Sequence, residues 1–169
     1  MSIFYPALLR ERIQNVTPDD LRSLGVKGIL LDVDNTLTRY HSRDLSAEVT
    51  AWLKTMQDEG FSLLVVSNGF AKRILPFTER IGLSAVPLSC KPSPIGFWRG
   101  AKRLGLSPRQ CVAIGDQIFT DVLGAKCAGV KTVLLTPIEL EHDRPDILFR
   151  RRFEVGIRRR FCQKHPERL

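Results

Sequence analysis

Residues 28–37 constrain the fold of this chain more than any other stretch. An apolar run at 29–31 ends directly in two acids, Asp32 and Asp34. A short apolar run bounded by turn-forming residues is typical of a buried strand. In open parallel α/β sheets ligands bind at the carboxyl ends of the strands, so two carboxylates there indicate a metal and nucleophile site. The alternative is an Asp-Asn-Thr turn without chemistry, because Asp and Asn favour turns for backbone reasons.

Short apolar runs alternate with helical segments along most of the 169 residues. A helix after Pro6 and a second from Thr17 to Gly25 are expected before the strand at 29–31. The sequence then predicts strands at 61–66, 85–88, 111–114 and 131–135, separated by helices over 46–60, 70–81, 93–105 and 121–128. This alternation predicts an α/β fold with a doubly wound parallel sheet. We expect one domain over residues 1–143, beginning with a short N-terminal helical segment.

Polar side chains follow four of the predicted extended segments, and their chemistry is complementary. The residues are Asp32 with Asp34, Ser67 with Asn68, Lys91, and Asp116 with Asp121. Carboxylates from two strands can hold Mg²⁺, whereas a hydroxyl, backbone N–H groups and a lysine can hold a phosphate. One carboxylate can attack phosphorus, and another can move protons.

Each of these residues also has a simpler interpretation. Ser67-Asn68-Gly69 could be a turn, Lys91 could be solvent-exposed, and Asp121 could be only a helix N-cap.

The segments 31–37, 65–68, 91–92 and 115–121 resemble, in order, the four motifs of the haloacid dehalogenase (HAD) superfamily. The resemblance covers residues 28–135 and implies a Rossmann-like fold with phosphatase activity. It implies Asp32 as nucleophile and Mg²⁺ ligand, and Asp34 as general acid/base whose backbone carbonyl is also a metal ligand. It implies Ser67 and Asn68 as phosphate ligands, and Lys91 as the group that neutralises the charge of the nucleophile and the phosphate. Asp116 is implied as a metal ligand, and Asp121 as a residue close by that holds the metal's water shell or orients Lys91.

Superfamily members select substrates with cap insertions, and this chain leaves little room for one. Residues 38–46 and 69–90 hold only short connections, so we expect a capless enzyme with an open site. The form of the motifs and the segment around Tyr5-Pro6 are similar to the YqeG-type subclass IIIA proteins. That subclass is similar to phosphatidylglycerophosphate phosphatases, which implies an anionic lipid substrate converted to phosphatidylglycerol.

The net charge of +8 is concentrated at the C-terminus, where residues 144–169 hold nine Arg or Lys and three Asp or Glu. We expect a basic, helical tail with Phe149, Phe153, Ile157 and Phe161 in one apolar stripe, placed on an anionic membrane. The alternatives are a C-terminal helix packed on the domain with a solvated basic side, or a disordered basic end. Nucleic-acid binding is not expected, because no recognition module accompanies the charge.

We therefore expect a Mg²⁺-dependent phosphatase that is cytoplasmic, with a peripheral position on the inner face of the membrane. No signal peptide or zinc pattern is expected, and the four cysteines are interpreted as free thiols. Two other functions stay open. One is a sugar- or nucleotide-phosphate phosphatase whose lid comes from another subunit, and the other is a non-catalytic phosphate-binding module.

Overall fold

A six-stranded parallel sheet forms the centre of the molecule in the computed structural model, which describes residues 2–40, 42, 44–140 and 145–169. After a first strand at one edge, the chain enters the middle of the sheet and runs outward on one side. It then crosses back and runs outward on the other side until it meets the first strand. This is a doubly wound α/β sheet, so the predicted fold class is confirmed. In spatial order the strands are β1 (Leu8–Arg10), β6 (Lys131–Leu135), β5 (Cys111–Gly115), β2 (Gly28–Leu31), β3 (Ser62–Val66) and β4 (Ser84–Val86).

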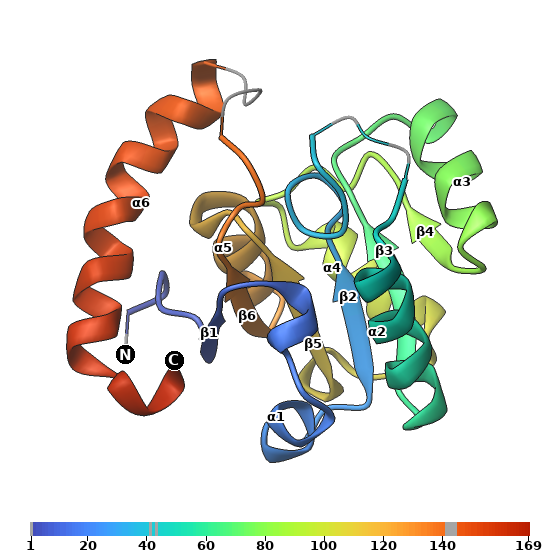
Figure 1. Cartoon of the computed structure of the whole chain (residues 1–169), viewed down its shortest axis with the longest axis horizontal. Helices are drawn as coiled ribbons and strands as arrows, with labels where there is room; N and C mark the ends of the chain where they lie inside the picture. Colours follow the sequence, from blue (N-terminus) through green and yellow to red (C-terminus); the bar gives the residue numbers. More distant parts are fainter. Residues whose placement is uncertain (1, 41, 43, 141–144) are drawn as a thin grey trace.

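Helices cover both faces of this sheet (Figure 1). Buried residues of α1 (Pro18–Ser23), α2 (Ala47–Asp58) and α3 (Ala71–Arg80) share one core with the sheet. Residues of α4 (Ile95–Arg103) and α5 (Leu123–Cys127) share the core on the opposite face. A π-helical turn, η3 (Ile118–Val122), leads into α5. Short 3-10 turns complete the chain: η1 (Ile13–Asn15), η2 (Pro108–Gln110) and η4 (Pro166–Arg168).

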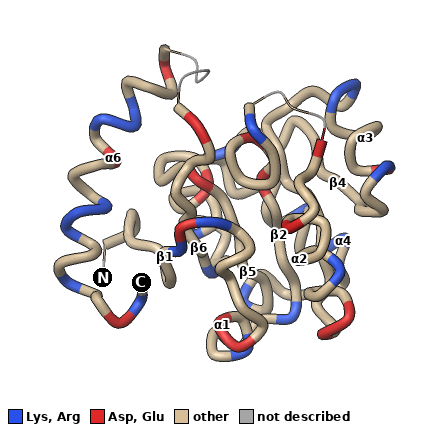
Figure 2. Tube along the Cα trace, in the orientation of Figure 1, with Lys and Arg blue, Asp and Glu red and all other residues tan. Residues whose placement is uncertain are grey.

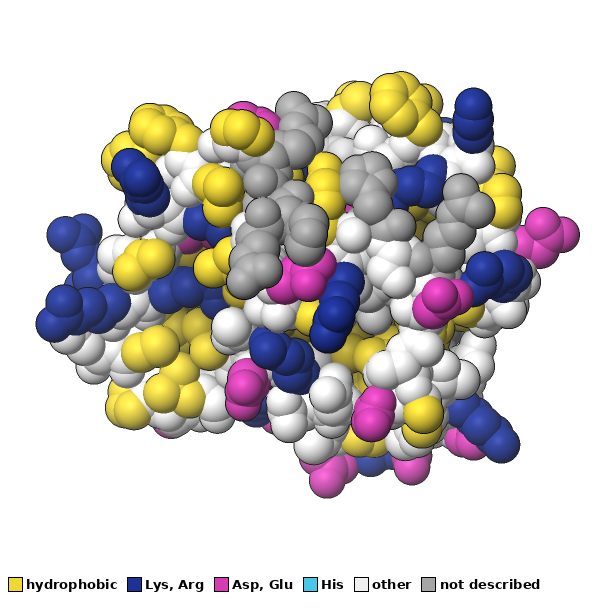
Figure 3. All heavy atoms as spheres, turned by 45° about the horizontal axis from the view of Figure 1, so that its top comes forward, with side chains coloured by type: hydrophobic (Ala, Val, Ile, Leu, Met, Phe, Trp, Pro, Cys, Tyr) yellow, Lys and Arg dark blue, Asp and Glu magenta, His cyan; other side chains and the backbone are white. Residues whose placement is uncertain are grey.

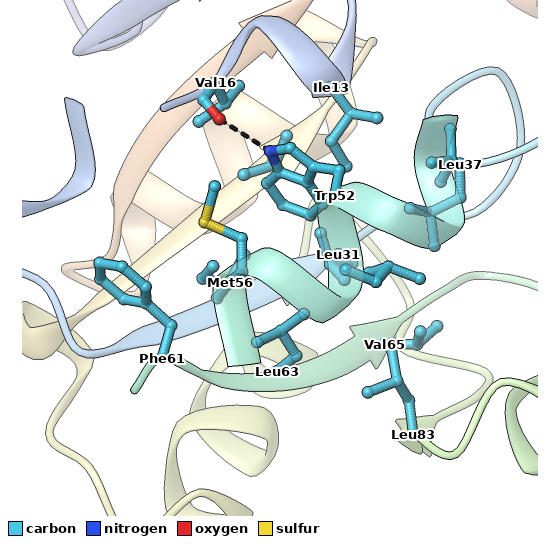
Figure 4. Close-up of a cluster of buried hydrophobic side chains, with 14 of the residues drawn as sticks. Ile13, Val16, Leu31, Leu37, Trp52, Met56, Phe61, Leu63, Val65 and Leu83 are labelled. Atoms are coloured by element: carbon cyan, nitrogen blue, oxygen red, sulfur yellow. Dashed lines mark hydrogen bonds between the residues drawn. The ribbon is translucent and has the colours of Figure 1, made fainter. Parts of the chain in front are cut away.

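The alternation of side chains along β2 explains why the sheet is buried on both sides. Ile29 and Leu31 enter the core beneath α2, whereas Leu30 enters the core beneath α4. Successive strand residues point to opposite faces, so an uninterrupted apolar run suits a strand covered twice. Trp52 of α2 is buried in the core beneath α2 and donates a hydrogen bond of 2.7 Å from Nε1 to the carbonyl oxygen of Val16 (Figure 4).

The helix predicted after Pro6 is wrong at residues 8–10, which form the edge strand β1. Leu8 pairs with Val133 of β6, and the N–H of Ala7 donates to Thr132 O at 2.8 Å. The segment is too short to nucleate a stable helix, whereas the open edge of β6 offers hydrogen-bond partners at once. Only η1, three residues long, is helical in the segment between β1 and Thr17.

The C-terminal residues form one long helix, α6 (Pro145–Lys164), which packs along the β1–β6 side of the molecule (Figure 1). Phe161 is fully buried, and its ring lies 5.6 Å from the ring of Tyr5. The basic segment is therefore an integral layer of the fold rather than an appendage. None of the helices in the described part of the chain combines the length and the hydropathy of a membrane-spanning segment.

Candidate active site

Three carboxylates meet at the carboxyl edge of the sheet, where β2 and β5 lie side by side. Leu31 pairs with Ile114, so Asp32 and Asp116 leave adjacent strands at nearly the same level. Oxygen atoms of Asp32, Asp116 and Asp121 all lie within 4.8 Å of one another. We refer to these three residues as the acid cluster. Its position is the crossover point of a doubly wound sheet, where such folds bind ligands.

Lys91 is buried and bridges two members of the acid cluster. Its Nζ lies 2.6 Å from Asp32 Oδ1 and 2.6 Å from Asp121 Oδ1. Burial by itself lowers the pKa of Lys91, but the carboxylates of Asp121 and Asp32 outweigh burial and raise it. Lys91 is therefore a fixed positive charge inside the site and not a solvent-exposed lysine.

The side chain of Asn68 holds the loop that carries Lys91. Its Oδ1 accepts hydrogen bonds from Lys91 N at 2.7 Å and from Ser89 Oγ at 2.9 Å, and its Nδ2 donates to Lys91 O at 3.0 Å. The loop also touches α4 closely, because a Cβ on Gly96 would lie 2.5 Å from Ser89 Cβ. In this structure the Asn68 side chain, predicted as a phosphate ligand, is engaged with the protein backbone.

Asp121 is placed by the π-helical turn that follows β5. Its Oδ2 accepts a hydrogen bond of 3.1 Å from the backbone N–H of Gln117, four residues earlier. The carboxylate lies over Gly115, where an added Cβ would stand 2.4 Å from Asp121 Cγ. Only glycine at position 115 allows this approach, so the Gly-Asp pair at the end of β5 positions Asp121 as well as Asp116.

Two arginines of α6 contact Asp116, and the sequence did not indicate them. Arg151 Nη2 lies 2.5 Å from Asp116 Oδ2, and Arg158 Nη2 donates to the carbonyl oxygens of Asp116 and Leu135, both at 2.7 Å. The arginine run is visible in the sequence, but nothing in it distinguishes inward from outward members. Burial raises the pKa of Asp116 to about 7, although Arg151 acts in the opposite direction.

A third arginine, Arg73 of α3, holds Asp34 and was also missed. Arg73 Nη1 donates to Asp34 Oδ1 at 2.8 Å, and Nη2 donates to Oδ2. The two side chains remain 23% and 22% exposed. Asp34 thus lies at the entrance of the site, whereas Asp32 lies beneath it in the acid cluster.

An open cavity of about 600 Å³ lies above these residues. Ser67 forms part of its wall, with Oγ accepting a hydrogen bond of 3.1 Å from the N–H of Gly69. Lys91, Arg73 and Arg150 supply positive charge to the same cavity. It therefore joins all the predicted phosphate and nucleophile residues to the first turn of α6, which sequence reasoning had placed outside the domain.

The acid cluster fits a divalent cation. Asp116 Oδ1 is buried and has no hydrogen-bond partner among the described residues, as expected of an oxygen reserved for a ligand. Burial raises the pKa of Asp32 to about 8, and Asp121 and Asp116 act in the same direction against Lys91. Hard oxygen donors of this kind suit Mg²⁺, and a bound cation would favour the ionised form of each carboxylate.

Comparison with known proteins identifies the class to which this site belongs. A model of haloacid dehalogenase-like hydrolases matches residues 39–129. The curated protein "Probable phosphatase YqeG" of Bacillus subtilis (strain 168) is 33% identical over 135 residues, which are 80% of this chain and 78% of that protein. The chain therefore belongs to the haloacid dehalogenase-like hydrolases, as a YqeG-type phosphatase. The predicted family and enzyme class, a phosphoric monoester hydrolase, are confirmed.

More distant relatives support the same class. A phosphoglycolate phosphatase of Pasteurella multocida (strain Pm70) is 30% identical over 120 residues, which cover 62% of this chain but only 53% of that protein. The cobalt-bound deoxy-D-mannose-octulosonate 8-phosphate phosphatase YrbI of Haemophilus influenzae aligns with a TM-score of 0.54 at 18% identity, over 66% of this chain and 69% of that one. A Listeria monocytogenes serotype 4b protein aligns at 0.56, also at 18% identity, over 70% and 85% of the two chains. These two structures confirm the fold.

Proposed function

We propose that this phosphatase removes the terminal phosphate of phosphatidylglycerophosphate at a membrane surface and leaves phosphatidylglycerol. The observation that carries the proposal is the wall of the catalytic cavity. That wall includes Ile147 and Arg150 of α6, and the same helix exposes the aromatic side chains of Phe149 and Phe153 beside them. A lipid phosphate held at a membrane would then reach Asp32 without leaving the bilayer surface.

The exposed face of α6 suits an anionic membrane. Phe149 and Phe153 are 62% and 57% exposed, with ring centroids 5.3 Å apart. Arg152, Arg159 and Arg160 are exposed on the same helix. Figure 2 shows basic residues distributed along α6, and Figure 3 shows hydrophobic and basic side chains together at that end of the molecule. Aromatic rings enter the headgroup region, and arginines attract anionic lipids.

The predicted apolar stripe of α6 divides between two environments. Four residues of an α-helix turn through roughly 40° more than a full circle. A stripe with a spacing of four therefore rotates around the helix, from the exposed Phe149 and Phe153 through the half-buried Ile157 to the buried Phe161. The N-terminal half of the stripe supplies the surface for lipid, and the C-terminal half anchors the helix to the domain.

The chemistry follows from the positions of Asp32 and Asp34. A carboxylate oxygen of Asp32 attacks phosphorus, the ester P–O bond breaks, and the leaving alkoxide takes a proton from Asp34. Asp34 then takes a proton from water, whose oxygen attacks the aspartyl phosphate, so that phosphate leaves and Asp32 is restored. Lys91 offsets the negative charge of the nucleophile and the phosphoryl group, and Ser67 lies in position to hold the phosphate.

Asp32, Asp116 and the backbone carbonyl of Asp34 would hold Mg²⁺, with Asp121 beside them. When bound, the cation supplies electrostatic stabilisation of the phosphoryl oxygens.

Hydrolysis of phosphatidylglycerophosphate in mixed micelles tests this function. We expect Mg²⁺-dependent release of phosphate by the wild type and no release by Asp32→Asn. When the terminal phosphate of the substrate carries ³²P, acid quenching should leave label on the wild-type protein but not on Asp32→Asn. Turnover of soluble phosphate esters far above that of the lipid would contradict the lipid assignment.

Co-sedimentation with vesicles tests the membrane surface separately. Deleting α6 would remove Phe161 and Arg151 from the interior, so exposed residues are better targets. We expect Arg152→Gln/Arg159→Gln/Arg160→Gln to lose binding to vesicles containing phosphatidylglycerol while turnover of a soluble ester is preserved. Lys54→Gln/Lys72→Gln/Lys102→Gln, a matched set of exposed charges on α2, α3 and α4, should bind as the wild type does. Equal binding by both variants would exclude α6 as the lipid surface.

A small phosphorylated carboxylic acid or sugar is the second candidate substrate. Its support is the match to phosphoglycolate phosphatases and to a glyceraldehyde 3-phosphate phosphatase of Methanopyrus kandleri, which is 33% identical over 95 residues covering 51% of this chain and 41% of that protein. A capless site would then need a lid from another subunit. A stable oligomer in gel filtration, together with high turnover of such esters, would favour this candidate.

A further inference from the structure

Arg73 occupies the carboxylate of Asp34, the residue that we propose as general acid/base. Both oxygens of the Asp34 carboxylate accept hydrogen bonds from the guanidinium, one of them at 2.8 Å. A carboxylate held at both oxygens by a guanidinium is not directed at the ester oxygen of a substrate. Catalysis therefore requires that Arg73 release at least one oxygen of Asp34.

An anion is the chemical group best able to cause this release. A guanidinium binds carboxylates and phosphates through two parallel hydrogen bonds, so a second anion can replace Asp34 without leaving the arginine unpaired. The pair lines the cavity and is partly exposed, which makes Arg73 accessible to such a group. Lys91, in contrast, is 4% exposed at its side chain and is paired with Asp32 and Asp121 beneath the cavity.

The position of Arg73 determines which part of the substrate it can contact. The scissile phosphate must reach Asp32, and its leaving oxygen must lie within a hydrogen bond of Asp34. Arg73 is one hydrogen bond further from the reaction centre than Asp34. A group bound by Arg73 thus belongs to the leaving alcohol, a few bonds beyond the ester oxygen.

We propose that Arg73 is a specificity-determining residue that binds a second anionic group on the leaving alcohol, and that this exchange of partners releases Asp34. The proposal rests on the roles proposed for Asp32 and Asp34, but not on the acyl chains of the substrate. In phosphatidylglycerophosphate the second anion is the internal phosphodiester, and in phosphoglycolate it is the carboxylate. Esters with no second anion leave Arg73 on Asp34 and react slowly.

Three soluble substrates test the proposal without a membrane. Glycerol 3-phosphate has no second anion, deacylated phosphatidylglycerophosphate has a phosphodiester, and 2-phosphoglycolate has a carboxylate. For the wild type we expect kcat/KM on at least one anion-bearing substrate to exceed that on glycerol 3-phosphate by about 10- to 100-fold, the range of a hydrogen bond to a charged group. Whichever of the two anion-bearing substrates has the higher kcat/KM identifies the anion that Arg73 binds.

Arg73→Gln should remove this preference by lowering kcat/KM on the anion-bearing substrate and raising the turnover of glycerol 3-phosphate, because the guanidinium no longer holds Asp34. If the phosphodiester is the preferred group, glycerophosphoglycerol, which carries only the diester, should inhibit the wild type competitively and should inhibit Arg73→Gln only weakly. If the carboxylate is preferred, glycolate is the corresponding inhibitor. Lys72→Gln removes the neighbouring charge, which is exposed and outside the cavity, and should behave as the wild type does.

Two results would overturn the proposal: a wild type that does not discriminate among the three substrates, or an Arg73→Gln variant that loses activity on all of them equally. The lipid assignment can fail independently. If deacylated phosphatidylglycerophosphate is preferred in an Arg73-dependent way but the intact lipid is not hydrolysed, the role of Arg73 stands and the lipid proposal fails.

Discussion

Arg151 of the C-terminal helix forms a buried ion pair with Asp116 at the end of β5, with 2.5 Å between Nη2 and Oδ2. The two residues are 35 positions apart, and their contact joins α6 to the acid cluster. Arg151 supplies one positive charge where three carboxylates meet. The other oxygen of Asp116, Oδ1, is buried and accepts no hydrogen bond from the described residues, so it is available to a cation.

Replacing Arg151 by Met should affect metal-free and metal-bound protein differently. Removing one partner of a buried ion pair costs about 3–5 kcal/mol, so the metal-free variant should unfold at lower denaturant concentration. Mg²⁺ would then compensate a cluster with one less positive charge, so its binding should stabilise the variant more than the wild type. Thermal or urea unfolding with and without Mg²⁺ measures both effects.

Arg152→Met is the matched control for this measurement, since Arg152 is the next residue on α6 and is exposed. It should leave stability within about 0.5 kcal/mol of the wild type, as surface substitutions usually do. An equal Mg²⁺-dependent gain in wild type and Arg151→Met would show that the ion pair has no influence on the cation site.

The fold and the acid residues could be predicted because their signals are local. The apolar run before Asp32 identifies a strand buried on both faces, and the parallel arrangement alone brings its end beside Asp116. The partner of each acid could not be predicted in this way. Arg73 and Arg151 reach the site through the orientation of α3 and α6, and that orientation is determined by packing between distant parts of the chain. The prediction of a helix at residues 8–10 was wrong for the same reason, because the strand β1 forms by pairing with the distant strand β6.

The acid cluster should make the effect of Mg²⁺ on stability depend on pH. The folded-state pKa values of Asp32, about 8, and Asp116, about 7, lie above the ordinary value of 3.8. Between about pH 4 and pH 8 the folded state therefore binds protons that the unfolded state has released. The contribution of these two carboxyl groups to the stability of the metal-free protein falls as the pH rises through this range, and it is constant above about pH 8.

Mg²⁺ binds the deprotonated carboxylates, so its stabilising effect should increase over the upper part of this range. We expect the Mg²⁺-induced rise in Tm to be larger at pH 8.5 than at pH 6. In Asp116→Asn, which loses one titrating ligand, the rise should be small at both values. A wild-type rise that does not change with pH would mean that protons and Mg²⁺ do not compete for the cluster.

Gly115→Ala should displace Asp121 without breaking the sheet. The added methyl group would stand 2.4 Å from Asp121 Cγ, so the carboxylate must move away from Lys91 and Gln117. We expect kcat to fall by about 10- to 100-fold, as when a charged hydrogen bond in the site is lost, while the fold is retained. Ala125→Gly, on the adjoining helix α5, controls for small changes near β5. Wild-type kcat in Gly115→Ala would show that the position of Asp121 is unimportant for turnover.

Asn68→Ala should reduce catalysis through Lys91 and not through lost phosphate binding. The amide makes three hydrogen bonds to the loop at Ser89 and Lys91, and without them the loop can shift the ammonium group relative to Asp32. Displacing a catalytic group by about 1 Å can cost roughly 100-fold in rate, so kcat should fall strongly while KM changes little. Ser89→Ala removes only one of the three bonds and should cost less. If Asn68→Ala instead raises KM at constant kcat, Asn68 binds the phosphate of the substrate directly, and its contacts with the lysine loop are secondary.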